Sequence, residues 1–384
     1  MKITQLHTLV NSITQEILGE VGLVQEDLSN VVDVGKEIID SDNVDNYVKK
    51  LVNHIGKVIF VNRLYAGGVP SVMMDSWEYG SVLEKITADL PTATENNSWN
   101  LTDGQTYNQD VFYQPKVSAK FFNSKVTFEI PMSFTERQVK ESFSSAEQLN
   151  GFISMIQTSI ENAMTVKLDA LIMRTINNMI GETINGDTTG VRAVNLLESY
   201  NTEYGQTLTS SVALKDANFV RYASYVMGLY VDRLSKISTL FNAGGKERFT
   251  PKDLLHVVLL SDFEKASATF LQSDTFNKEL VALPNHETVP YWQGSGTTYA
   301  LADTSKIKVK TSTGVDVEQA GIIGVMFDRD ALGVTNLDRR VTTNYNAKAE
   351  FYNNFYKFDA GYYNDLNENF VVFYLGDTVA GGGE

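Results

Sequence analysis

The stretch SSAEQLNGFISMIQTSIENAMTVKLDALIMRTINNMI, residues 144–180, predicts a single, very long helix. Ser144 and Glu147 have the spacing of a capping box, in which each residue satisfies a backbone N–H group left open by the first helical turn. Apolar residues then recur at helical spacing as far as Ile180, and Gly181 is typical of a residue that ends a helix. A helix of about 36 residues is roughly 54 Å long, several times an average globular helix.

The residues after this helix predict a compact α/β lobe. Its predicted elements are an amphipathic helix at residues 216–241, a buried strand at 255–260 and further strands at 306–312 and 321–327. Ser261 and Glu264 form a second capping box, which predicts that a helix follows the first of these strands directly. The lobe as a whole is expected to span residues 215–330 and to enclose a small central sheet.

The C-terminal residues 336–384 are rich in aromatic and β-branched side chains, which predicts two or three long strands. We expect their aromatic face to pack on the long helix, since interleaved acidic residues disfavour a platform for stacking nucleic-acid bases. Arg339 and Arg340 are candidate contacts to the acidic groups of a neighbouring chain. Pairing with Asp338 and a solvated strand edge are the alternatives for these two side chains.

The segment before the long helix predicts two further parts. Residues 1–60 have the apolar spacing of a helical arm that needs a partner surface. Residues 61–132 contain short β-leaning runs between Gly and Pro residues, with little apolar content for a core, which predicts an extended hairpin. Its large apolar side chains are therefore candidate inter-subunit contacts: Trp77, Tyr79, Trp99, Phe112, Tyr113, Phe121 and Phe122.

Composition and motifs exclude several classes of protein. The net charge of −15 disfavours a protein whose main task is neutralising phosphates. The absence of cysteine excludes disulfides, thiolate nucleophiles and cysteine-ligated zinc. The four histidines are scattered, and the chain has no phosphate-binding loop, no nucleophile elbow and no membrane-length apolar run. We expect neither enzymatic activity nor a bound cofactor.

One short motif raises a metal hypothesis. In GIIGVMFDRDALGV, residues 321–334, an apolar run leads directly into Asp328 and Asp330. Two carboxylates at the end of a buried strand could hold a divalent cation. The same residues could instead end the strand, with Asp328 capping the turn that follows. Because no further acidic residues are obviously brought to this point, we interpret Asp328 as a turn cap and expect no metal.

The order of these parts resembles that of the major capsid proteins of tailed double-stranded DNA phages, the Hong-Kong-97-type fold, an α+β architecture. The local phrases are most similar to short-tailed phages of the phi-29 type: NYVKKLVNHIGKVIF, SWEYGSVLEKI, SFSSAEQLNGFISMIQTSIENAM, LLHVVLLSDFEKASATF and VMFDRDALGV. The resemblance implies five regions: an arm at 1–60, an extended loop at 61–132, a peripheral domain with a spine helix at 133–194, an axial α/β domain at 195–335, and peripheral return strands at 336–384.

The resemblance also implies a function. The chain would be a structural subunit of an icosahedral phage head, self-assembling in the host cytoplasm into pentamers and hexamers that enclose double-stranded DNA in the virion. A scaffolding protein and a portal would be its partners, with no membrane involved. An encapsulin-like shell that encloses a cargo protein is the nearest alternative. A metal-dependent enzyme that uses Asp328 and Asp330 is the more distant one.

Overall fold

The computed structural model describes residues 69–74, 82–107, 110–135, 146–272, 284–292 and 305–377. The chain forms two units, Met1–Asn62 with Asn150–Met155 and Arg63–Leu149 with Ile156–Glu384, and nearly all described residues belong to the second. The predicted arm, the capping box at Ser144, and two candidate contacts, Trp77 and Tyr79, lie outside the described residues. No helix in the described part of the chain is both long and apolar enough to span a membrane.

The long helix is present as α5, Ala146–Gly186, with 41 residues. The predicted end at Gly181 is wrong, because the helix continues for more than a turn beyond it. A Cβ atom at Gly181 would overlap the Cγ2 atom of Val309, which lies in strand β8 (Lys306–Lys310). Glycine at this position therefore lets a neighbouring strand approach the helix closely, which is a packing role that sequence alone does not distinguish from helix ending.

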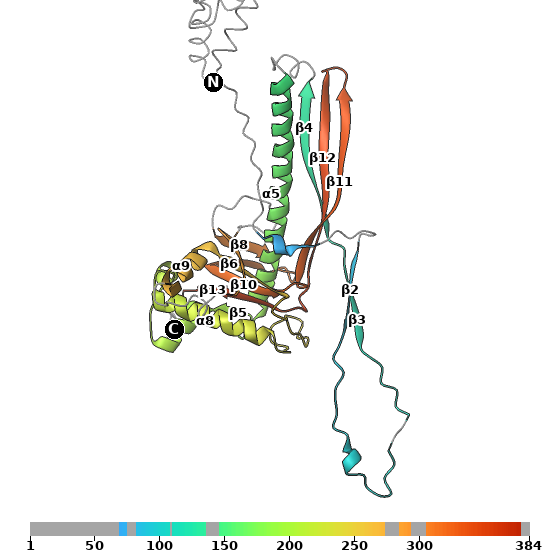
Figure 1. Ribbon diagram of the computed structural model, residues 1–384, viewed down its shortest axis with the longest axis vertical. Helices are drawn as coiled ribbons and strands as arrows, with labels where there is room; N and C mark the ends of the chain where they lie inside the picture. Colours follow the sequence, from blue (N-terminus) through green and yellow to red (C-terminus); the bar gives the residue numbers. More distant parts are fainter. Residues whose placement is uncertain are drawn as a thin grey trace, which may run out of the picture. The chain divides into compact units, whose positions relative to one another are not determined.

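The α/β lobe contains a five-stranded sheet (Figure 1). Its strand order is β5 (Ala193–Asn195), β13 (Phe370–Tyr374), β10 (Ile322–Asp328), β6 (Leu255–Leu260) and β7 (Glu287–Val289). The central strand β10 is antiparallel to both β13 and β6, and all seven of its residues are buried. The predicted strands at 255–260 and 321–327 are thus confirmed, since each overlaps one of these strands.

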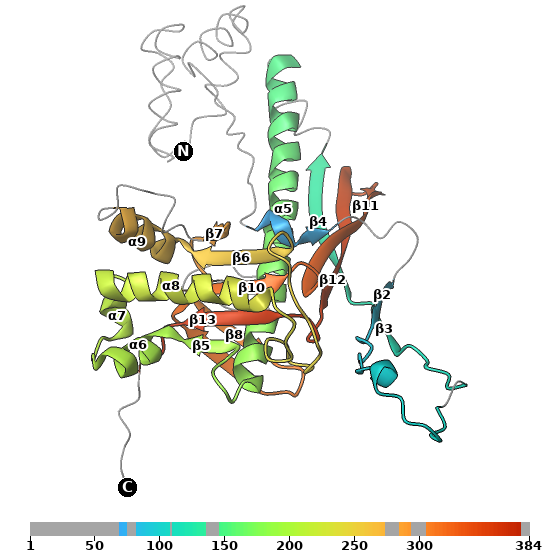
Figure 2. The same cartoon turned by 60° about the horizontal axis from the view of Figure 1, so that its bottom comes forward.

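Helices α6 (Leu196–Tyr204), α7 (Ser210–Ala213), α8 (Ala217–Leu234) and α9 (Ser261–Gln272) surround this sheet, as Figure 2 shows. Asp216 caps α8 by accepting a hydrogen bond from the Phe219 N–H group at 2.8 Å. The predicted extent of this helix to residue 241 is wrong. After Leu234 the backbone turns, and Ser238 pairs with Arg248 in an isolated β-bridge. That bridge uses the backbone groups that a continuing helix would need.

A four-stranded sheet packs on the first part of α5 (Figures 1 and 2). Its order is β1 (Met73–Met74), β11 (Leu332–Asn346), β12 (Phe351–Asn364) and β4 (Lys125–Thr135). The rings of Phe128 and Phe358 lie 4.9 Å apart and belong to the same buried core as Ile160 and Met164 of α5. The predicted packing of the aromatic strands on the long helix is therefore confirmed.

Two strands lie in other sheets than the sequence suggests. Residues 125–132, expected in the projecting loop, pair with β12 as part of β4. β13, expected among the return strands on the long helix, pairs with β10 in the lobe. The remaining strands form two hairpins, β2 (Leu83–Ala88) with β3 (Val117–Phe122) and β8 with β9 (Asp316–Ala320). The β2–β3 hairpin is therefore shorter than the predicted loop.

The packing at Gly181 predicts that alanine at this helical position lowers the free energy of unfolding, whereas alanine in place of glycine usually raises it. Alanine normally favours a helix over glycine by about 1 kcal/mol. Overpacking against the buried Val309 costs about 1–3 kcal/mol, so we expect Gly181→Ala to lower the free energy of unfolding by up to about 2 kcal/mol, measured by denaturant unfolding. Val309→Ala should be less costly in the Gly181→Ala background than in the wild type, because it removes the overlap.

Gly228 of α8 is the matched control, since no atom lies within 4 Å of a Cβ placed there. Gly228→Ala should raise the free energy of unfolding by roughly 0.5–1 kcal/mol. Equal stabilisation by both alanine substitutions would contradict the packing role of Gly181.

Candidate functional site

The two faces of the β2–β3 hairpin differ in their surroundings. Lys85 and Lys120 are directly opposite each other in the antiparallel register, on the face that turns toward the lobe and that also carries Leu83 and Phe122. The other face carries Ile86, Val117 and Phe121, whose residues are 64%, 60% and 64% exposed, together with Glu84. Surface strands usually bury their apolar face and expose their polar face. Here both lysines lie inside while three large apolar side chains lie outside.

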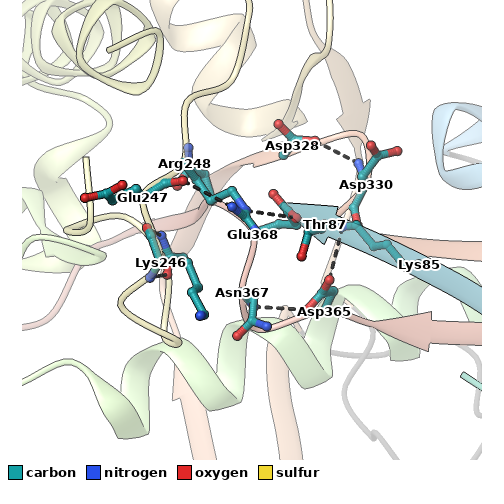
Figure 3. Close-up of polar contacts among 12 residues, drawn as sticks. Lys85, Thr87, Lys246, Glu247, Arg248, Asp328, Asp330, Asp365, Asn367 and Glu368 are labelled. Atoms are coloured by element: carbon teal, nitrogen blue, oxygen red, sulfur yellow. Dashed lines mark hydrogen bonds and ion pairs between the residues drawn. The ribbon is translucent and has the colours of Figure 1, made fainter. Parts of the chain in front are cut away.

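The two lysines bind an acidic turn between β12 and β13 (Figure 3). Lys85 Nζ donates to Asp365 Oδ2 at 3.0 Å, to Glu368 Oε1 at 2.7 Å and to the Asp330 carbonyl oxygen at 3.1 Å. Lys120 Nζ donates to Asp365 Oδ1 at 2.8 Å. Glu368 Oε1 also accepts from Arg248 Nε at 3.3 Å. We call these five side chains, Lys85, Lys120, Arg248, Asp365 and Glu368, the anchor cluster.

The carboxylates of the anchor cluster are shielded from water, with side-chain exposures of 3% for Asp365 and 9% for Glu368, whereas the side chains of Lys85 and Lys120 are 18% and 43% exposed. Buried ion pairs add little net stability compared with apolar packing, but removing one member leaves an uncompensated charge at high cost. Their hydrogen-bond geometry is directional, unlike apolar contact. The cluster therefore fixes how the base of the hairpin lies on the lobe.

Asp365 stays ionised at neutral pH. Burial raises the pKa of Asp365, but hydrogen bonds from Lys120, Lys85 and the Asn367 N–H group lower it by more, so the pKa of Asp365 lies below its ordinary value. A carboxylate with a lowered pKa contributes stability above its ordinary pKa and loses that contribution as the pH falls through the lowered value. The contribution of Asp365 to the anchor is therefore fully present at neutral pH and is lost on acidification through this lowered pKa.

Beyond the anchored base, the described residues 89–107 and 110–116 belong to a loop with almost no core of its own. Trp99, Phe112 and Tyr113 are 95%, 86% and 84% exposed, and these three candidate contacts lie on the loop. Other exposed apolar side chains of the loop are Leu90, Leu101, Tyr107 and Val111. Seven large apolar side chains are thus exposed on this one loop.

The other predicted contacts differ in their surroundings. Phe121 is exposed on the outer face of the hairpin. Phe122 points to the opposite face, and its ring centre lies 4.9 Å from that of Tyr363, so it contacts its own chain. The prediction missed Ile86 and Val117. Apolar and polar residues alternate from Val117 to Phe121, which contains the signal for Val117, whereas LEKITA has no such alternation to mark Ile86.

Arg339 and Arg340 form ion pairs within the chain. Arg340 Nη1 lies 2.6 Å from Asp359 Oδ2 and 3.2 Å from Asp338 Oδ2, so the alternative of pairing with Asp338 is present. Arg339 Nη1 lies 3.4 Å from Glu161 Oε2 of α5. Both arginines and their partners are solvent-accessible, and such pairs are individually weak. Their contact with a neighbouring chain stays a prediction.

Asp328 has a structural role that accounts for both of its oxygens. Oδ1 accepts from the Asp330 N–H group at 2.9 Å, and Oδ2 accepts from the Thr250 hydroxyl at 2.7 Å. The predicted turn cap is thus confirmed, and the turn links β10 of one sheet to β11 of the other. Asp328 is buried whereas Asp330 is exposed. Among the described residues, no three acidic or histidine side chains lie close enough together to hold a metal ion.

Comparison with known proteins identifies a family and solved structures to which this chain is similar. A family described as Phi29-like phage major capsid protein matches residues 10–374. The chain matches the capsid structure of Staphylococcus phage Andhra with a TM-score of 0.58 at 8% identity, over 84% of this chain and 87% of that chain. It also matches the structure of head fiber and inner core protein gp22 of native bacteriophage P68, with a TM-score of 0.56 at 9% identity, over 83% and 87%. The search of curated proteins found no match.

These similarities confirm the Hong-Kong-97-type fold expected from the sequence. At such low identities the structural matches show the fold alone. The family match, which covers most of the chain, shows the family independently of them. The arm at 1–60 and the use of the loop stay predictions.

The anchor cluster predicts that replacing Lys85 lowers the stability of the chain much more than replacing Lys252, which lies outside the cluster. Lys85→Met removes three hydrogen bonds and leaves two buried carboxylates with fewer cations, so we expect the free energy of unfolding to fall by about 2–3 kcal/mol. Protease cleavage within residues 89–116 should become faster as the hairpin loses its anchor. Lys252 forms an exposed pair with Asp232 and is the control. Lys252→Met should change the stability by less than about 0.5 kcal/mol. Equal effects of the two substitutions would contradict the anchoring role.

Proposed function

Because the chain belongs to the Phi29-like phage major capsid protein family and is a structural subunit of a phage capsid, we propose that it builds the shell through its β2–β3 hairpin. The outer face of the hairpin and the loop at 89–116 would lie on another copy of the chain. The observation that carries this proposal is that the hairpin exposes Ile86, Val117 and Phe121 on its outer face, while its lysines bind the lobe.

The size of the apolar surface supports a contact between copies. Burying the side chains of Trp99, Phe112, Tyr113 and Phe121 at about 150 Å² each would contribute roughly 600 Å². A specific interface of standard size takes about 800 Å² from each partner. Four side chains on one hairpin would therefore supply most of one side of such an interface. No comparable apolar area is needed for the chain's own core, which is already formed without them.

We propose pentamers and hexamers as the products of this association, with double-stranded DNA enclosed and a scaffolding protein and a portal as assembly partners. The family match supports these finer statements by kinship. The net charge of −15 supports enclosure without sequence-specific binding, because an acidic protein does not hold phosphates strongly. The family is structural rather than enzymatic, and it favours neither a cargo-enclosing shell nor a metal enzyme.

Shortening the hairpin tests the proposal. Asp89 and Lys116 are already joined by a backbone hydrogen bond of 2.9 Å. Replacing residues 90–115 by Asn-Gly, the dipeptide preferred in two-residue hairpin turns, leaves β2, β3 and the anchor cluster in place. We expect unchanged thermal unfolding of the subunit and loss of shells, measured by sedimentation and electron microscopy in the presence of the native assembly partners. Normal shells from the shortened chain would refute the proposal.

Single substitutions refine the same test. Trp99→Ser, Phe112→Ser and Tyr113→Ser should each lower the yield of shells at least tenfold, because each removes a large apolar contact. The neighbouring exposed Asn100→Ser is the matched control and should assemble normally. If the aromatic variants unfold at lower temperature than Asn100→Ser, these rings belong to the subunit's own core and the proposal is wrong.

A further inference from the structure

The two edges of the four-stranded sheet differ in how they are protected. β4 forms one edge and carries Pro131 in its middle, opposite Phe355 of β12. Proline has no N–H group to donate, so it blocks the addition of a further strand. β11 forms the other long edge, and among the described residues only its base, Val334 and Thr335, is covered, by β1. From Asn336 onward, β11 has β12 as its single described strand partner.

The outer part of β11, residues 341–346, lacks the sequence features that usually prevent an edge strand from pairing with another strand. The strand has an irregularity between Asn336 and Asp338, and the charged residues end at Arg340. The remainder, VTTNYN at residues 341–346, has no charge, no proline and no glycine. Its Val341 and Tyr345 are exposed. An exposed, uncharged edge of this kind is a template for pairing with another strand.

We propose that this edge pairs antiparallel with the same edge of a second copy, about a twofold axis at Thr343. This register puts Thr343 opposite the partner's Thr343, and Val341 opposite the partner's Tyr345. Threonine pairs and pairs of an aromatic with a β-branched residue are both favourable across antiparallel strands. The two four-stranded sheets would become one continuous sheet, joined by an interface in which each copy uses the same residues.

Charge distinguishes this register from two of the alternatives. With the axis at Thr343, Asp338 of one copy lies near the partner's Lys348, beyond the end of the strand. With the axis at Asn344, Arg340 would face the partner's Lys348, and Asp338 would face the partner's Glu350. An axis at Arg340 would place two arginines opposite each other. Like charges directly opposite are unfavourable, so only the Thr343 register among these three joins opposite charges.

The pairing of β11 edges rests on the proposed association between copies of the chain, but it does not depend on the β2–β3 hairpin. The β2–β3 hairpin and the outer edge of β11 are different surfaces of the chain. A second copy is a suitable occupant because a capsid presents many identical edges at high local concentration. The edge contact would then join subunits through backbone hydrogen bonds, whereas the hairpin would join them through apolar side chains.

The absence of cysteine from the chain makes a clean test possible. Residues directly opposite in an antiparallel pair have Cα atoms about 4.5–5.5 Å apart, within the range of about 4.4–6.8 Å that a disulfide requires. Assembled particles of Thr343→Cys, treated with a mild oxidant, should yield covalent dimers on a non-reducing gel. Ser133→Cys, on the Pro131-protected edge, and Thr342→Cys, one residue out of register, should yield at least tenfold less dimer.

A second variant keeps the test decisive if Thr343→Cys does not assemble. The double variant Val341→Cys with Tyr345→Cys should form covalent dimers, whereas each single variant should not, because only the pair is opposite across the axis. Shells that form normally without dimers in either experiment overturn the edge pairing and leave the proposed function intact. Equal dimer yields from Ser133→Cys and Thr343→Cys would also overturn it, since they would reflect random encounters.

Discussion

The packing of α5 against two separate sheets is the constraint on which the rest of this structure depends. Its first part contributes Ile160 and Met164 to the core with Phe128 and Phe358 of the four-stranded sheet. Its later part is buried at Leu171, Ile176 and Ile180, and it lies beside the lobe in both views (Figures 1 and 2). One helix therefore shares its apolar surface between two sheets.

A two-stranded hairpin is at best marginally stable in water, so the β2–β3 hairpin needs support from the rest of the chain. That support comes from the anchor cluster and from Phe122, whose ring packs on that of Tyr363. Ile86, Val117 and Phe121 point to the other face of the hairpin and stay exposed.

The turn at Asp328 shows how the two layers are connected. β10 and β11 are consecutive in the chain, yet they belong to different sheets. Asp328 holds the turn by accepting from Asp330 and Thr250, and the carbonyl of Asp330 also accepts from Lys85. The hairpin is therefore anchored at the point where the chain passes from the lobe to the four-stranded sheet. A change in the angle between hairpin and lobe would have to break contacts at this same point.

The sequence by itself determined the elements whose signal is local. Apolar spacing predicted α5 and the strands β6 and β10, and the Asp328 turn followed from residues within a few positions of one another. It also identified Trp99, Phe112 and Tyr113, because large apolar residues in a segment without a core need a partner. The tertiary structure alone decided which strands pair and which glycine permits close packing. β4 pairs in the four-stranded sheet and β13 in the lobe, Gly181 faces Val309, and Lys85 binds Asp365, which is 280 residues away in the chain. The physical reason is that periodicity records which face of an element is buried, whereas the identity of the group that buries it depends on residues far away in the chain.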